Sequence, residues 1–230
     1  MPDTFICAYE LSGDGHGTPI DESALSAQPP RDLPVWVHLS ARSTAAREWL
    51  ETNANLPDGT VADALLAEDT RPRLMSQAEG LLLILRGVNL NAEADPEDMV
   101  SIRIWIEAKR FISVQLRNLR GVEEMRERLD TGTGPADIGD LVTTFIEGSI
   151  ARLTPVMGDL GDVIDELEER ILQMDLNGIR EHIVSTRRKA IIFHRFLAPQ
   201  KDIVQRLIEL EAPWLDEACR PRRAREPLTR

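Results

Sequence analysis

The second half of the chain, from Pro135 to about Glu217, carries an apolar pattern with the period of an α-helix. Between positions 138 and 174, apolar side chains recur mostly at steps of three and four residues, which places them along one stripe of a helix. This stripe is longer than an ordinary globular helix of about 8–20 residues. We therefore predict a long helical arm that buries its stripe against neighbouring helices, the first half of the chain or other copies of the chain. The stripe consists of Ile138, Leu141, Phe145, Ile150, Leu153, Met157, Leu160, Ile164, Leu167, Ile171 and Met174.

Prolines and glycines divide this helical region. Pro155 lies inside its first part, where a proline removes a backbone hydrogen bond and clashes with the preceding turn, so we expect a kink or break near residues 152–155. The polar, glycine-containing segment 175–178 predicts a turn. A second helix should cover residues 179–197, be kinked or restarted at Pro199, and continue along the chain. The result would be a pair of antiparallel helices.

The two predicted helices carry opposite charge. Residues 135–175 contain ten acidic and two basic side chains, whereas residues 176–230 contain seven acidic and twelve basic ones. The simplest interpretation is that the two helices pair through this difference. The basic chain end could also face anionic membrane lipids. The chain as a whole has a formal net charge of −12, which argues against a nucleic-acid-binding protein.

The first 134 residues alternate between strand and helix patterns. The run at 81–88 is apolar throughout, which is typical of a strand buried on both faces. Residues 99–107 and 111–116 alternate between apolar and polar side chains, as expected for a hairpin closed by Ala108, Lys109 and Arg110. The full prediction is strands at 5–9, 35–39, 73–77, 81–88, 99–107 and 111–116, short helices after Ser43 and from Pro57-Asp58, a helix at 121–130, and a loop at 11–31.

This order of elements predicts an α/β fold. Consecutive antiparallel strands with helices set apart from them favour an α/β/α layered domain with a mixed, largely antiparallel sheet, followed by the long antiparallel helical arm. The segment Thr131-Gly132-Thr133-Gly134-Pro135 breaks the chain between the two parts. We therefore place the α/β domain at residues 1–134 and the helical arm at residues 135–230.

The chain has few features that would mark a secreted or membrane-spanning protein. Cys7 and Cys219 are far apart and fit no metal-binding spacing, which favours a reducing cytosol. The first residues lack the basic and apolar segments of a signal peptide. The longest apolar runs are much shorter than the roughly 20 residues that a membrane-spanning helix needs. We expect the chain as given to be soluble.

Three motifs occur together in an order that resembles a known family. They are residues 68–73 (Glu-Asp-Thr-Arg-Pro-Arg) followed by 80–89 (Gly-Leu-Leu-Leu-Ile-Leu-Arg-Gly-Val-Asn), residues 131–135 (Thr-Gly-Thr-Gly-Pro), and residues 198–202 (Ala-Pro-Gln-Lys-Asp) followed by 213–215 (Pro-Trp-Leu). At this spacing they resemble the cytoplasmic part of CorA-type divalent-cation transporters, and more closely the zinc-transporting (ZntB-type) branch. The resemblance extends from about Val35 to Leu215.

The resemblance implies an architecture and a set of partners. Members of the family are homopentamers in the cell inner membrane, and each subunit has an α/β/α cytoplasmic domain, a long stalk helix and two C-terminal transmembrane helices. The apolar spans and the Gly-Met-Asn-like pore signature do not occur in this sequence, so no pore residue can be placed on it. The match stops where the arm leads into the stalk. We expect an excised soluble part whose partners are its own transmembrane segment and further copies of itself.

An acidic row on the first predicted helix is the main candidate for a binding site. Asp162, Glu166 and Glu169 share one helical face, with Asp159 one turn earlier and Asp165 beside them. Hard divalent cations bind several carboxylate oxygens, so Asp159, Asp162, Glu166 and Glu169 form a candidate regulatory cation site. Zinc would prefer histidine or cysteine among its ligands, and none is interleaved here. Alternatively, the row is a solvated face that pairs with the basic segment 180–189.

The histidines and the remaining motifs give weaker indications. His182 and His194 point about 120° apart on one helix, so that helix alone cannot make them ligands of one ion. His38 lies in a strand and should be a packed or hydrogen-bonded core residue, whereas His16 lies in a glycine-rich loop beside an aspartate and could hold zinc only weakly. No serine or cysteine lies in a recognisable nucleophile motif, and the phosphate-loop pattern is missing.

Two functions from different classes follow. The first is the sensing domain of a CorA-like transporter, which would pass the state of a bound divalent cation along the arm to a gate outside this chain, with Pro155–Gly161 as a flexing segment. By resemblance, Zn2+ or Mg2+ would be the transported or regulatory ion, with no other cofactor, no nucleic acid and no enzymatic activity. The alternative is a stand-alone soluble helical interaction module that self-associates or binds partners.

Overall fold

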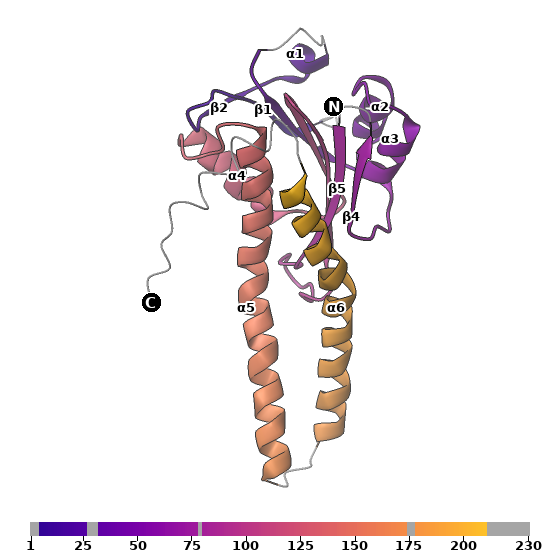
Figure 1. The fold of residues 1–230 in the computed structure, drawn as a ribbon, viewed down its shortest axis with the longest axis vertical. Helices are drawn as coiled ribbons and strands as arrows, with labels where there is room; N and C mark the ends of the chain where they lie inside the picture. The colour runs from indigo at the N-terminus through magenta and orange to yellow at the C-terminus, as the bar shows by residue number, and fades with distance from the viewer. Residues whose placement is uncertain (1–4, 27–31, 78–79, 174–177, 211–230) are drawn as a thin grey trace.

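The computed structural model describes residues 5–26, 32–77, 80–173 and 178–210. In Figure 1, the two longest helices lie side by side and extend together well beyond the sheet. The elements are β1 (Phe5–Leu11), β2 (Gly17–Pro19), α1 (Glu22–Ser26), β3 (Val35–Ser40), α2 (Thr44–Thr52), α3 (Gly59–Leu66), β4 (Arg73–Gln77), β5 (Gly80–Gly87), β6 (Val100–Glu107), β7 (Arg110–Gln115), α4 (Arg120–Asp130), α5 (Ile138–Leu172) and α6 (Ile179–Glu209).

The strands form one seven-stranded sheet in the order β2-β1-β3-β7-β6-β5-β4. The β3 and β7 strands are parallel, and all other neighbours are antiparallel. The hairpin between β6 and β7 turns at Ala108 and Lys109, with Glu107 paired opposite Arg110. The predicted mixed, largely antiparallel sheet is therefore confirmed.

Helices cover both faces of this sheet. On one face, α2 and α3 bury a core that includes Trp49, Leu65 and Trp105. On the other face, α4 and parts of α5 and α6 bury a core that includes Phe145 and Ile203. Alternate residues of the apolar β5 strand belong to the two cores, as expected for a strand covered on both faces. The predicted α/β/α layering is confirmed.

Short polar side chains start the helices at the predicted positions. Ser43 precedes α2, and its hydroxyl oxygen accepts a hydrogen bond from the backbone N–H of Ala46 at 3.2 Å. Asp58 precedes α3 and accepts from the N–H of Thr60 at 2.8 Å. Each bond satisfies a backbone donor that the first helical turn leaves unpaired.

The sequence predicts a loop over residues 11–31, but part of this segment is regular structure. It contains the three-residue strand β2, which pairs with β1, and the five-residue helix α1. Both elements are too short for a periodic pattern to develop, and β2 is fixed by its pairing rather than by its own sequence. The prediction of a continuous loop was wrong here.

The glycine-rich segment 131–135 is held against the rest of the domain. The N–H of Gly134 donates to the carbonyl oxygen of Gly15 at 2.9 Å, so the β1–β2 turn and this segment are joined. The residues that follow, Ile138 and Leu141 on α5, lie in the same core as the sheet. The domain boundary proposed at residue 134 stays a prediction.

Both arm helices continue through their internal prolines. Pro155 lies inside α5 and Pro199 lies inside α6, and neither interrupts its helix (Figure 1). Both prolines are exposed, as are Ala151 and Arg195, whose carbonyl groups lose their helical donors. Water can therefore satisfy these carbonyls. The break expected near residues 152–155 does not occur, and the kink named as its alternative stays a prediction. The predicted turn at residues 175–178 lies mostly outside the described residues.

Only part of the apolar stripe on α5 is covered. Ile138, Leu141 and Phe145 are buried beneath the sheet. Farther along the arm, Ile150 and Ile171 remain 50% and 48% exposed. Met174 lies outside the described residues. The apolar stripe is therefore buried where it packs against the sheet, and much of the rest stays exposed to solvent.

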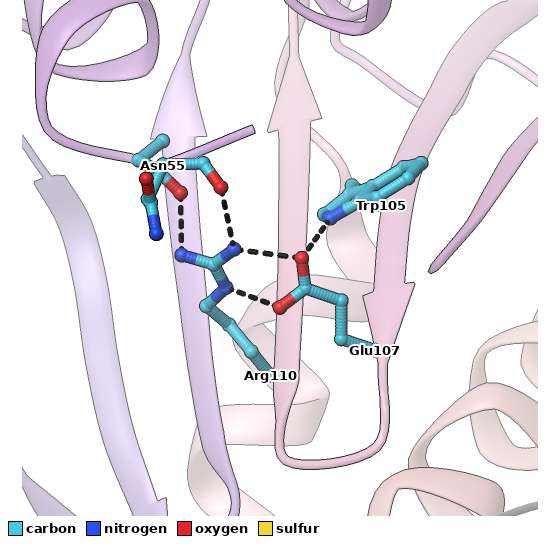
Figure 2. A network of polar contacts seen from close by, with 5 residues as sticks. Asn55, Trp105, Glu107 and Arg110 are labelled. Carbon is cyan, nitrogen blue, oxygen red and sulfur yellow. Dashed lines mark hydrogen bonds and ion pairs between the residues drawn. The ribbon is translucent and has the colours of Figure 1, made fainter. Parts of the chain in front are cut away.

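A polar network fixes the β6–β7 hairpin to the loop between α2 and α3 (Figure 2). Glu107 accepts hydrogen bonds from Trp105 Nε1 at 2.7 Å and from Arg110 Nε at 2.8 Å. Arg110 also donates to the backbone carbonyl oxygens of Ala54 and Asn55. One arginine thus ties a hairpin end to the helical layer above it.

His38 is a fully buried core residue, as the sequence predicted. Its Nδ1 lies 2.7 Å from the Ser113 hydroxyl oxygen, which also accepts from Trp36 Nε1 at 2.8 Å. Burial lowers the pKa of His38 from 6.5 to about 4. The imidazole is therefore neutral in the folded chain at pH 7.

We predict that this histidine makes folding pH-dependent. Between pH 6.5 and about 4, the unfolded chain binds a proton at His38 and the folded chain does not. Stability should therefore fall as the pH drops through this window, by up to about 3 kcal/mol from this residue. Urea unfolding at several pH values measures the effect. His38→Gln should remove this part of the pH dependence, whereas His194→Gln, at an exposed position on α6, should retain it; equal slopes in the two variants would contradict the assignment.

Candidate functional site

The four predicted cation ligands lie on one helix but do not gather around one point. Asp159, Asp162, Glu166 and Glu169 are all exposed on α5. Asp159 and Glu166 line a groove of about 450 Å³ between α5 and α6, and the other two do not. Within the described residues, no group of three or more histidine, cysteine, aspartate or glutamate side chains is arranged to hold a metal ion. The four acids, called the acid stripe below, therefore stay a predicted cation site.

The bases of α6 do not neutralise the acid stripe directly. Among the residues with described positions, no ion pair joins the stripe to the basic segment 180–189. Lys189 instead lies 3.4 Å from Glu97, in the loop before β6. Arg170 Nη1 lies 3.1 Å from His182 Nδ1, and this contact joins α5 to α6 near the far end of the arm. The predicted direct pairing of the acid stripe with that segment is absent.

The motifs that carry the family resemblance meet at Arg86, on β5. Its Nε donates to the carbonyl oxygen of Thr70 at 3.1 Å, and its Nη1 donates to that of Met99 at 2.9 Å. Its backbone N–H donates to Gln200 Oε1, on α6, at 2.7 Å. The Arg86 guanidinium carbon also lies 4.9 Å from the centre of the Phe196 ring. Segments 68–73, 80–89 and 198–202, which are distant in sequence, thus form one joint between the sheet and the arm.

Arg103 is a buried charged residue whose burial the sequence did not predict. It was assigned to the polar face of an alternating strand, yet its side chain is fully buried because helices cover both faces of the sheet. Its Nη2 lies 3.5 Å from the carbonyl oxygen of Glu68, and its Nε and Nη1 have no hydrogen-bond partner. Burial lowers the pKa of Arg103 to about 10, and the positive charges of Arg86 and Arg47 act in the same direction. Strand alternation alone cannot show this burial, which depends on the position of β6 in the sheet.

The remaining candidate residues are dispersed. His16 Nδ1 lies 3.4 Å from Asp14 on the β1–β2 turn, at an exposed position. His194 is exposed on α6, and His182 takes part in the contact with Arg170. Cys7 is buried, and burial raises the pKa of its thiol to about 12, which keeps it protonated and unreactive at neutral pH. Cys219, Trp214 and the arginine-rich chain end lie outside the described residues.

We predict that the bond between Gln200 and Arg86 stabilises the docking of α6 on the sheet. Gln200→Leu leaves the Arg86 N–H without its acceptor and should cost about 1–3 kcal/mol of unfolding free energy. Gln205→Leu, at an exposed position on the same helix, should cost less than about 0.5 kcal/mol. Urea unfolding of both variants measures the difference, and similar costs would show that the bond has no particular role.

The chain is similar in sequence to a family of known proteins. The family model described as "CorA-like Mg2+ transporter protein" matches residues 32–228. The zinc transport protein ZntB of Pectobacterium atrosepticum is 32% identical over 217 residues, which are 94% of this chain and 65% of that protein. The divalent cation transporter CmaX of Pseudomonas aeruginosa is 36% identical over 217 residues, or 92% of this chain and 64% of that protein. The chain thus spans about 65% of the length of these relatives.

Solved structures agree with the sequence comparison. The cytoplasmic domain of ZntB from Vibrio parahaemolyticus matches 97% of this chain and 86% of that chain, with a TM-score of 0.81 and 28% identity. Full-length CmaX matches 94% of this chain and 67% of that chain, with a TM-score of 0.81 and 33% identity. No described helix has both the length and the apolar character needed to cross a bilayer. From the sequence match and the fold, we conclude that this chain belongs to the CorA-like family of Mg2+ transporter proteins.

Proposed function

We propose that this chain is the cytoplasmic, cation-sensing part of a divalent-cation transporter, with zinc as the transported ion. The main support is the match of 97% of the chain to the ZntB cytoplasmic domain at 28% identity. In this proposal the pore belongs to a membrane-spanning part outside these residues, and the complete protein lies in the cell inner membrane. The relatives are named as transporters, so we propose no enzymatic activity.

The acid stripe is the proposed sensor. Its four carboxylates lie on the exposed part of α5, where like charges repel and a divalent cation would relieve that repulsion. Without histidine or cysteine ligands, such a row suits Mg2+ at least as well as Zn2+, so the regulatory and the transported ion need not be the same. Binding affects a gate only if the cation prefers one arrangement of the arm over another. The joint at Arg86 would connect that arrangement to the α/β domain.

We predict that neutralising the acid stripe alters cation-dependent transport. In the full-length protein, Asp159→Asn, Asp162→Asn, Glu166→Gln and Glu169→Gln together should raise the cation concentration that half-inhibits zinc uptake by at least about tenfold, because the favoured state loses its ligand contacts. Zinc uptake into vesicles at graded Zn2+ and Mg2+ concentrations measures this half-inhibiting concentration.

A control variant removes four exposed acids elsewhere. It carries Asp32→Asn, Glu48→Gln, Glu51→Gln and Asp63→Asn, all at exposed positions. This variant should respond to cation like the original protein. Unchanged cation dependence of uptake in the acid-stripe variant would exclude the stripe as the sensor. If the original protein shows no zinc uptake into vesicles, the proposed function is excluded.

The exposed apolar side chains of the arm support a homo-oligomer, which we propose to be a pentamer as in the family. Val184 and Ile191 on α6 are 61% and 56% exposed, and Ile164 and Leu172 on α5 are also exposed. Burying such side chains between copies is favourable. The same surface fits the alternative function, a self-associating interaction module, which the uptake experiment distinguishes from a transporter domain.

We predict that charges on this surface weaken self-association. Val184→Lys with Ile191→Lys would place two ammonium groups in the interface and should shift the particle mass toward the monomer. Light scattering after size-exclusion chromatography measures it. Leu33→Lys, at an exposed apolar position before β3, should retain the original mass. A monomeric original chain, or equal masses for the original and the double variant, would contradict this interface.

A further inference from the structure

A second pocket lies at the joint between the α/β domain and α6, away from the acid stripe. It has a volume of about 370 Å³ and is bordered by the loop before β4, the start of β6, the segment after β7, and α6. Three arginines from three different elements line it: Arg86 on β5, Arg117 after β7, and Arg195 on α6. Such a convergence of guanidinium groups is typical of anion-binding sites.

Four carboxylates also line the pocket, but among the described residues only one of them forms an ion pair with these arginines. Arg86 lies 3.5 Å from Asp69, whose side chain is 95% exposed. Arg117 and Arg195 form no ion pair with any residue whose position is described. Burial lowers the pKa of Arg86, and the nearby charges of Arg195 and Arg117 lower it further while Asp69 opposes them. Two guanidinium groups therefore remain available for an anion.

The buried Arg103 adds a fixed positive charge behind the pocket wall. In the β5–β6 pairing, Arg86 lies opposite Ser101, and Arg103 follows two residues after Ser101 on β6. Arg103 therefore lies on the same face of the sheet as Arg86 and Ser101. Ser101 lines the pocket, and Arg103 is fully buried with two unpartnered donor atoms. No carboxylate is among the charges that shift its pKa. Its field acts on the pocket through a medium of low polarizability, where charges are screened less than in water.

Besides Asp69, three acidic side chains border the pocket: Glu68, Glu97 and Asp98. Glu97 is paired with Lys189 at 3.4 Å. Glu68 and Asp98 are exposed at the rim. Neither is among the charges that act on Arg86, where Asp69 is the only acid. Beside the three guanidinium groups themselves, an anion is attracted and a divalent cation is repelled.

The pocket also has an aromatic wall that orients the guanidinium groups. The Phe196 ring lies 4.9 Å from the Arg86 guanidinium carbon and 5.5 Å from that of Arg195. Both cations therefore contact the same ring, on the side of the pocket formed by α6. Leu116 adds apolar surface. The cavity is within the size range of sites that hold small organic ligands.

From this arrangement we propose that the pocket binds a phosphate group, either as free phosphate or as the phosphoryl group of a small metabolite. Arg117 and Arg195 would donate to its oxygens, and Arg86, whose guanidinium donates to backbone carbonyls, would add positive charge. Phosphate has several acceptor oxygens and up to two negative charges, which match the planar donor pairs of several arginines better than a single carboxylate does. The inference does not depend on the proposed transport function. It assigns a ligand site to the joint where the arm meets the sheet.

Calorimetric titration of the 230-residue chain with inorganic phosphate and with adenosine monophosphate tests the proposal. We expect saturable binding that Arg117→Gln with Arg195→Gln weakens at least about tenfold. The control, Arg187→Gln with Arg188→Gln, removes two exposed arginines of α6 that do not line the pocket. It should bind within about twofold of the original chain.

The titrations distinguish free phosphate from a phosphorylated metabolite, and two results would contradict the proposal. Equal affinity for both ligands identifies free phosphate as the occupant, and tighter binding of the monophosphate ester identifies a phosphorylated metabolite. The absence of saturable binding of either ligand at millimolar concentration would overturn the proposal. So would an equal loss in both arginine variants, because it would show that binding follows net charge and not the pocket. Thermal unfolding of the variants confirms that these exposed substitutions leave the fold intact.

Discussion

The docking of α6 onto β5 is the contact on which the arrangement of the arm depends. Two long helices of this kind would otherwise be free to move relative to the sheet. The hydrogen bond from the Arg86 N–H to Gln200, together with buried Ile203 and Leu207, holds the returning helix in place. The first turns of α5 lie in the same core. The arm is therefore attached to the sheet through the start of α5 and the end of α6. Within the described ranges, the next part of the arm packs against the other helix and the loop between β5 and β6.

Much of the fold follows from the sequence pattern, because most core strands and helices show either a clear apolar period or a continuous apolar run. The run at β5, the alternation at β6 and β7 and the starts of α2 and α3 were predicted close to their observed positions. The missed elements, β2 and α1, are too short to show a period. Of the alternatives expected at Pro155 and Pro199, the break and the restart are wrong because both helices continue through their prolines, and the kinks stay predictions.

The candidate sites were less predictable than the fold. The acid stripe could be identified from spacing, but its proximity to bases could not, and Lys189 turned out to contact Glu97 instead. Arg103 was assigned to the polar face of β6 because alternation does not reveal that helices cover that face. The arginine pocket was not found at all, since Arg86, Arg117 and Arg195 come together only when α6 folds back onto the sheet.

The arm thus carries two regions of opposite charge along its length. Toward its far part, the acids of α5 remain exposed and without ion pairs to the basic segment of α6, so their mutual repulsion depends on the cations around them. At its base, guanidinium groups with few acidic partners border the contact with the sheet, so their repulsion depends on anions. A cation bound at one region and an anion bound at the other would each relieve a different electrostatic cost in the same pair of helices. Because α6 contributes residues to both the groove beside the acid stripe and the arginine pocket, a displacement of this one helix would alter both of them together.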